Sequence, residues 1–137
     1  MVRSKNGRIP FHTACLHGHL SAVKLLLNEN IHQIEAKDSC GITPFMDALQ
    51  ADHLNLIEYL INNCTLIDIK DKDKLGNSCI HLMAQSGSIN CLKFLFYKYY
   101  SDQATLLDDF KSTLNDFKMT PMHSACKVII NLEDLSF

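Results

Sequence analysis

The chain has 137 residues, of which 47% are hydrophobic, so it is long enough to form one folded domain with a sizeable core. Its 13 basic and 15 acidic residues give a formal net charge of -2, which excludes a global field that would recruit nucleic acid or an anionic membrane surface. Its apolar stretches are far shorter than the roughly 20 residues that span a bilayer, and the N-terminus shows no secretory signal. We therefore predict a cytoplasmic or nuclear protein with no membrane span and no direct contact with nucleic acid.

An internal repeat begins close to the N-terminus. Gly7, Gly41 and Gly76 open three similar segments and lie 34 and 35 residues apart. A second set of apolar positions keeps the same spacing, since Val23 is answered by Ile57 and then by Leu92. A fourth segment starts near Thr120, after an insertion between residues 97 and 118. Because both sets of positions recur at the same spacing, the sequence predicts a stacked repeat array.

Each repeat is predicted to contain two helices. Pro10, Pro44 and Pro121 are placed for the first turn of a helix, where a missing N–H group costs nothing, and Thr43 is placed to cap that turn. Gly18 and Gly87 fit sharp turns between helices, and apolar residues at i, i+3 and i+4 spacing form the core stripe of each second helix. The predicted helices span residues 11–17, 21–29, 45–51, 55–63, 80–86 and 89–99.

The segments between repeats are predicted to be exposed β-hairpins, which we call fingers. Residues 34–41 and 67–76 both end in Asp-x-x-Gly, a sequence typical of a tight turn. The insertion at 101–117 carries Leu106, Leu107, Phe110 and Leu114 at helical spacing, which predicts an additional helix.

Some residues depart from the repeat. Repeat two has Met46 and Asp52 where a histidine and a turn glycine are expected, and repeat three has Cys79 in place of the proline. Lys118 stands at the glycine position of the fourth segment. We expect the sequence to specify the local fold less strongly at these positions.

The segment Thr43-Pro44-Phe45-Met46-Asp47-Ala48 and its counterparts resemble the ankyrin repeat, whose signature is T-P-L-H-x-A followed by a G-H turn and a V-x-x-L-L helix. The resemblance implies an all-α solenoid of helix-turn-helix units with β-hairpin loops. Residues 1–137 would form one domain, with repeats at about 4–37, 38–72 and 73–114, an insertion near 101–117 and an incomplete fourth repeat at 115–137.

The resemblance also implies a function, which is binding of another protein through a concave surface. Within the family, residues 12–24 and 38–48 are similar to the middle-to-late repeats of a member that associates with alanyl-tRNA synthetase and supports aminoacylation fidelity. That similarity implies the synthetase as a partner. The lysines that accept misactivated serine in that member belong to repeats without a match here, so none is assigned in this chain.

Cysteine and histidine are abundant enough to suggest a metal site or an active site. The six cysteines contain no C-x-x-C pair, and we expect all of them to be packing residues. His12, His81 and His123 occupy the signature histidine of the repeat and are expected to bond to backbone, while His17 and His19 lack further zinc ligands. We therefore predict no metal, no cofactor and no catalytic residue.

Three functional hypotheses remain at this stage. The leading one is a protein-binding module, the second is a fragment or short isoform without independent activity, and the third is an enzyme or metal protein. For the first, geometry places contact residues on the exposed side of the inner helices and on the fingers, and Asp47 and Gln50 are expected to matter most. The candidates are Thr13, Leu16, His17, Asp38, Ser39, Asp47, Gln50, Ala51, Lys72, Asp73, Lys74, Leu82, Gln85 and Ser86.

Overall fold

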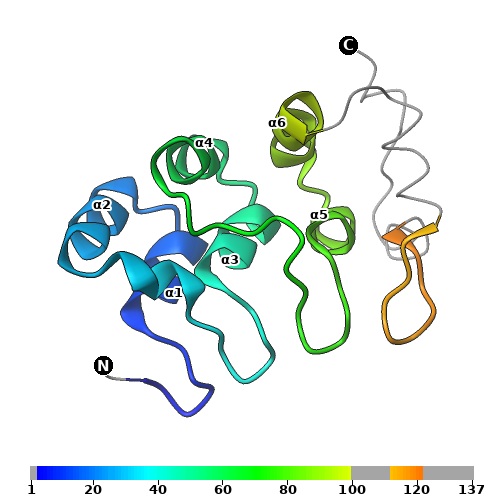
Figure 1. Ribbon diagram of the computed structural model, residues 1–137, viewed down its shortest axis with the longest axis horizontal. Coiled ribbons are helices and arrows are strands. Elements are labelled where there is room, and N and C mark those ends of the chain that lie inside the picture. Colours follow the sequence, from blue (N-terminus) through cyan, green and yellow to red (C-terminus); the bar gives the residue numbers. More distant parts are fainter. Residues whose placement is uncertain (1–2, 100–111, 122–137) are drawn as a thin grey trace.

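The computed structural model describes residues 3–99 and 112–121. The described part is a row of three helix pairs, with an inner helix and an outer helix in each pair (Figure 1). The six helices predicted at residues 11–17, 21–29, 45–51, 55–63, 80–86 and 89–99 are each confirmed to within one residue at each end. The inner helices are α1 (Pro10–Leu16), α3 (Pro44–Gln50) and α5 (Cys79–Ser86), and the outer helices are α2 (Leu20–Glu29), α4 (Leu54–Asn63) and α6 (Ile89–Tyr99).

The helices start where their capping residues lie. Pro10 and Pro44 are the first residues of α1 and α3, and the Thr43 hydroxyl accepts the Met46 N–H at 3.2 Å, as predicted. Helix α5 begins with Cys79 instead of proline, and there the Ser78 hydroxyl accepts the His81 N–H at 3.4 Å. A short 3-10 helix, η1 (Ile31–Glu35), follows α2 and was not predicted.

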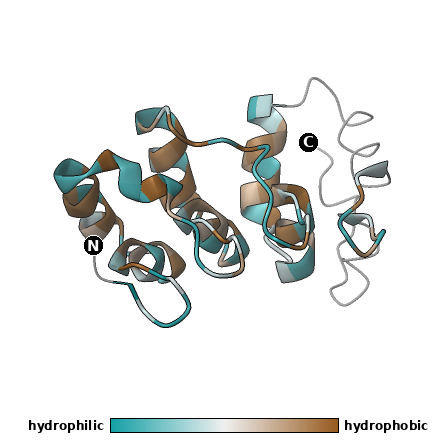
Figure 2. Cartoon of the chain, turned by 60° about the horizontal axis from the view of Figure 1, so that its bottom comes forward, coloured by the Kyte–Doolittle hydropathy of each residue, from teal (hydrophilic) through white to brown (hydrophobic). Residues whose placement is uncertain are grey.

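The core lies between the two helix layers and between successive repeats. Figure 2 shows hydrophobic residues concentrated on the helices, while the connecting loops are largely hydrophilic. Leu60 on α4 is fully buried, because α4 packs against α3 of its own repeat and α6 of the next. Leu26, the equivalent residue on α2, is only half-buried. It lines an open hollow of repeat one that is bordered by residues 3–14 as well as by α2. Of the predicted core stripes, Ile57 and Leu60 are buried and Ile61 is half-buried in repeat two, whereas only Val23 is buried in repeat one.

The fingers are tight loops, and the residues that the structure describes contain no β-strand. Four fingers follow one another, at residues 3–8, 37–42, 70–77 and 114–119. In the second finger, the Asp38 N–H donates to Ile42 O at 3.0 Å, and the Gly41 N–H donates to Asp38 O at 3.0 Å. The Asp38 carboxylate accepts the N–H groups of Cys40 and Ile42, each at 2.9 Å. Because the side chain takes up these donors, the finger closes without the paired strands that the sequence predicted.

Neighbouring fingers are joined by backbone hydrogen bonds. The Ser39 N–H donates to Asn6 O at 2.8 Å and the Lys74 N–H to Cys40 O at 2.9 Å. Gly41 has a φ of +78°, and a Cβ atom there would lie 2.8 Å from the Lys74 nitrogen, so glycine is needed both for the turn and for the close approach of the next finger. The fingertips are consequently held in line with one another.

The fourth finger is visible at residues 112–121. The Asp116 N–H donates to Leu75 O at 2.8 Å, which continues the row of fingers, and Lys118 takes a φ of +61° at the glycine position. Most of the predicted helix of the insertion falls outside the described residues, but Leu114, its last apolar member, is 48% exposed in the fourth finger and is not helical, so that part of the prediction is wrong. The predictions for His123 and Cys126 fall outside the described residues. No described helix is long and apolar enough to cross a membrane.

Candidate protein-binding surface

Most of the predicted contact residues lie exposed or half-buried on one side of the array. They come from the inner helices and the fingers, which follow one another along the row in Figure 1. We call this set the recognition face: Thr13, Leu16, His17, Ser39, Gln50, Ala51, Lys72, Asp73, Lys74, Gln85 and Ser86. Its inner-helix members carry no carboxylate, ammonium or guanidinium group, whereas charge gathers on its fingers.

Three of the predicted contact residues are instead buried, and the prediction needs correction there. Leu82 is 1% exposed and belongs to the core. Asp38 and Asp47 are 9% and 4% exposed, so a partner could reach little of either side chain. Their positions in the repeat predict that all three are open to a partner, but the Arg8 side chain of the preceding repeat covers Asp38 and Asp47.

An ion-pair cluster explains the carboxylate at position 47. The Arg8 guanidinium donates from Nη1 to Asp38 Oδ2 at 2.9 Å and from Nη2 to Asp47 Oδ2 at 2.6 Å. One side chain of repeat one thus binds the finger and the inner helix of repeat two. Asp47, which was expected to be a leading partner contact, is a residue of the scaffold.

The two carboxylates of this cluster differ in their pKa shifts. Burial raises the pKa of Asp47, and the attraction of Arg8 opposes this shift without cancelling it. Burial also acts to raise the pKa of Asp38, but the N–H groups of Ile42 and Cys40, together with Arg8, outweigh it and lower the pKa. Asp38 is therefore the better stabilised anion of the pair.

The signature histidines hold the repeats together, as predicted. His12 Nδ1 accepts the Ile9 N–H at 3.2 Å, so Nε2 carries the proton and donates to Ile42 O of the next repeat at 2.9 Å. His81 repeats this arrangement, with Nδ1 accepting the Ser78 N–H at 3.2 Å and Nε2 bonded to Met119 O at 2.9 Å. Burial lowers the pKa of His81, which favours the neutral ring that this pattern requires.

Asp52 has a specific role that the sequence analysis missed. It adopts a φ of +56° at the position of the turn glycine. Its carboxylate accepts the Cys91 N–H at 2.9 Å and the Asn90 side-chain amide at 3.0 Å, both in the first turn of α6. A carboxylate at a helix N-terminus is favoured by the helix dipole, so repeat two caps a helix of repeat three. The expected weakness at position 52 is therefore offset by this contact.

The described cysteines are free thiols, and most of them fill the core. Cys15, Cys64, Cys79 and Cys91 are buried, which confirms their prediction as packing residues, whereas Cys40 is exposed on a fingertip and does not fit that prediction. Burial raises the pKa of the Cys15 and Cys79 thiols to about 12, so both stay protonated at neutral pH. Among the residues described, no group of three or more His, Cys, Asp or Glu side chains could hold a metal ion.

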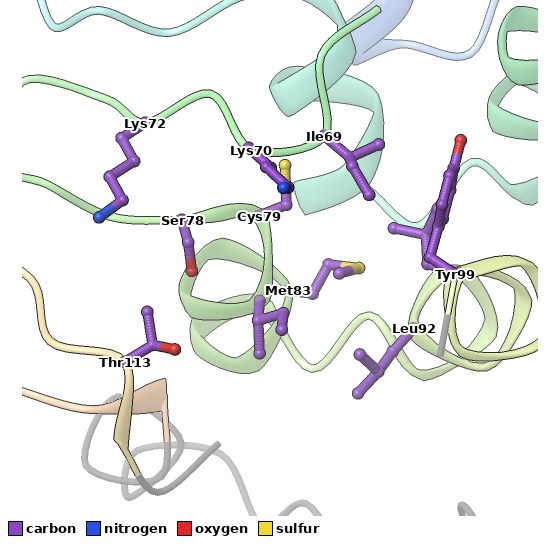
Figure 3. Close-up of a pocket in the computed structure, with 11 residues that line it drawn as sticks. Ile69, Lys70, Lys72, Ser78, Cys79, Met83, Leu92, Tyr99 and Thr113 are labelled. Atoms are coloured by element: carbon purple, nitrogen blue, oxygen red, sulfur yellow. The ribbon is translucent and has the colours of Figure 1, made fainter. Parts of the chain in front are cut away.

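A largely apolar cavity of about 420 Å³ opens on the side of repeat three that faces the fourth finger. Met83 and Leu92 lie on its inner side in Figure 3, and Thr113 of the fourth finger approaches from the opposite side. Lys70 and Lys72 come from the third finger at its rim. No pattern in the sequence predicts this cavity, because it depends on how repeat three meets the segment that follows.

Helix pairs in a row, with fingers and histidines that join each repeat to the next, define a helical repeat protein. Residues 1–73, more than half of the chain, match the family described as Ankyrin repeats (3 copies). The chain belongs to the ankyrin-repeat family.

Several curated proteins are similar to this chain. The ankyrin repeat protein nuc-2 of Neurospora crassa is 30% identical over 90 residues, which are 65% of this chain and 8% of that protein. Ankyrin repeat domain-containing protein 63 of Mus musculus is 31% identical over 96 residues, covering 69% of this chain and 24% of that protein. The poly(ADP-ribose) polymerase tankyrase of Caenorhabditis elegans is 26% identical over 158 aligned positions, which cover 90% of this chain and 7% of that protein. The chain therefore spans less than a quarter of the length of each of these relatives.

Proposed function

We propose that this chain is a protein-recognition module that binds its partner through the recognition face. The observation that carries the proposal is the contrast between neighbouring residues of the same inner helices. Phe45, Met46 and Asp47 are buried in the scaffold, whereas Gln50, one turn further along α3, is only half-buried, and Gln85, at the same position of α5, is exposed. Polar side chains that the scaffold leaves at the surface are available to a partner.

We propose that the module acts by binding and not by catalysis. The thiols of Cys15 and Cys79 are held protonated by burial, and the Asp38 and Asp47 carboxylates are engaged by Arg8. His12 is bonded to backbone through both ring nitrogens. These groups serve the scaffold, and free buried thiols are typical of proteins in the reducing cytosol or nucleus, where we place the protein.

Replacing Gln50 and Gln85 together by alanine tests the proposed surface. The two amides stand at the same position of successive repeats, and the Gln85 amide has only a 3.5 Å contact with Asn77 Oδ1. We expect partner binding to weaken by about 1–3 kcal/mol with a nearly unchanged melting temperature. The measurement is capture from cell lysate on the immobilised chain, with recovered proteins quantified by mass spectrometry.

The matched control is Asn28→Ala with Asn62→Ala. These two amides are exposed on the outer helices α2 and α4, away from the recognition face. The control variant should capture the same proteins as the unmodified chain. If it loses them while the Gln50/Gln85 variant retains them, the binding surface lies on the outer helices and the proposal is wrong.

Alanyl-tRNA synthetase is a more specific candidate for the partner. It follows from the resemblance of residues 38–48 to ankyrin repeat domain-containing protein 16. Phe45, Met46 and Ala48, which contribute to that resemblance, are buried packing residues, so exposed neighbours such as Gln50 would have to make the contact. Recovery of the synthetase in the capture experiment, and its loss with the Gln50/Gln85 variant, would support this assignment.

A further inference from the structure

Basic residues are concentrated on the fingers. The four fingers, residues 3–8, 37–42, 70–77 and 114–119, hold eight of the chain's 13 basic side chains but only four of its 15 acidic ones. The fingers therefore carry an excess of four positive charges, although the whole chain has a net charge of -2. Such a separation of charge creates a local field that favours an acidic ligand.

Six of these finger cations are exposed and form no ion pair within the described part of the chain. Lys37 is already paired with Asp71 at 3.0 Å, and Arg8 is engaged by Asp38 and Asp47. The finger carboxylate of Asp73 is turned inward, where it accepts the N–H groups of Leu75 and Asn77 at 2.9 Å each. The exposed cations that remain are Arg3, which donates to the backbone oxygens of Gly7 and Lys37, and Lys5, Lys70, Lys72, Lys74 and Lys118.

An apolar line runs between these lysines. Cys40, Leu75 and Phe117 occupy the same position on the second, third and fourth fingers, and all three are exposed, Leu75 to 49% and Phe117 to 64%. The backbone bonds from Lys74 to Cys40 and from Asp116 to Leu75 hold these tips in line. Exposed apolar side chains in a row, bordered by charge, are typical of a protein interaction site.

The spacing of the fingers suits an extended chain. Helices in contact lie roughly 8–10 Å apart, and an extended chain rises about 3.3 Å per residue, so about three residues correspond to one finger. A segment of about ten residues would cross all four tips. A nucleic acid fits less well, because the carboxylates of Asp71 and Asp116 lie among the lysines and would repel an unbroken row of phosphates.

We propose that the fingertips bind an extended acidic segment of a partner protein, with apolar side chains of that segment on the Cys40–Leu75–Phe117 line and its carboxylates on Lys5, Lys72, Lys74 and Lys118. This inference rests on the proposed function and adds the chemical class of the partner. It assigns affinity to the tips and leaves the inner-helix amides to contact the rest of the partner.

The test is fluorescence anisotropy with a labelled ten-residue peptide. The peptide has leucine at every third position and glutamate at the others. We expect the peptide to bind the full chain and the affinity to fall as salt rises. Lys74→Glu should weaken binding about fivefold, and Leu75→Ser should act in the same direction by a similar factor. Circular dichroism verifies that each variant is folded.

Three comparisons make the outcome decisive. Lys98→Glu reverses an exposed lysine on the outer helix α6, and it should leave the affinity unchanged. A peptide with glutamine in place of glutamate should bind at least tenfold more weakly, and a single-stranded RNA of ten nucleotides should bind more weakly than the acidic peptide. Equal effects of Lys98→Glu and Lys74→Glu, equal binding of the glutamine peptide, or tighter binding of the RNA would overturn the inference. If the acidic peptide fails to bind while capture still depends on Gln50 and Gln85, this inference fails and the proposed function stands.

Discussion

Replacing Arg8 by methionine is expected to lower the free energy of unfolding by about 3 kcal/mol, because it leaves two buried carboxylates without their cation. The side chains of Asp38 and Asp47 are 7% and 6% exposed, so water cannot take the place of the guanidinium. The Arg8 side chain is 25% exposed, which places the expected loss at the lower end for a broken buried pair. Chemical denaturation of both proteins measures the difference.

A second substitution, at Asp47, is expected to compensate in part for the loss of the Arg8 cation. Repeat three has a buried leucine, Leu82, at the position that Asp47 occupies in repeat two. Arg8→Met combined with Asp47→Leu should therefore recover part of the lost stability, since an apolar pair replaces the Arg8–Asp47 ion pair, while the Asp38 carboxylate keeps only the N–H groups of Cys40 and Ile42. If the double variant is as unstable as the sum of the two single variants, the contact between Arg8 and Asp47 is not the source of the effect.

The loss caused by Arg8→Met should also depend on pH. Burial raises the pKa of Asp47 even beside Arg8, and removal of the cation raises it further. A group whose pKa is higher in the folded state than in the unfolded state favours folding when protonated, and this contribution is lost as pH rises through the folded-state pKa. The difference between the two proteins should thus shrink from about pH 7 to about pH 5, a range in which Asp38, whose pKa is lowered, stays ionised. A constant difference would contradict this account.

Leu60→Ala is expected to cost about 2–5 kcal/mol of unfolding free energy. Leu60 is fully buried on α4, between its own inner helix and the outer helix of repeat three, so the lost methyl groups leave a cavity that rigid neighbours cannot fill. Leu26→Ala should cost less, because Leu26 is only half-buried. Thermal or chemical unfolding gives both values.

The matched control for this series is Leu25→Ala. Leu25 lies on α2 beside Leu26 but is 68% exposed, so its truncation should change stability by less than about 0.5 kcal/mol. Equal losses at Leu60, Leu26 and Leu25 would show that burial between repeats does not determine these effects.

The helices could be predicted because their signals are local. Pro44 and Thr43 begin α3 through bonds within four residues, and Gly18 and Gly87 turn the chain with positive φ at single positions. The signature histidines were assigned correctly for the same reason, since the position within the repeat determines the backbone groups near the ring.

The burial of the site residues could not be predicted, because it depends on pairs that are distant in sequence. Asp47 appeared exposed by its helical position, and only the approach of Arg8, 39 residues earlier, shows that it is part of the scaffold. Asp52 appeared to be a poor substitute for glycine until its contact with Cys91, 39 residues later, became visible. Both contacts cross between repeats, and a repeat pattern does not specify which polar side chains meet there.

Hydrogen exchange of the chain alone and in complex with a captured partner tests the proposed recognition face most directly. The account predicts slower exchange on binding for the fingers at residues 37–42 and 70–77 and for the C-terminal ends of α3 and α5. The outer helices α2 and α4 should exchange at the same rate in both states. Protection confined to the outer helices, with the fingers unchanged, would contradict the account.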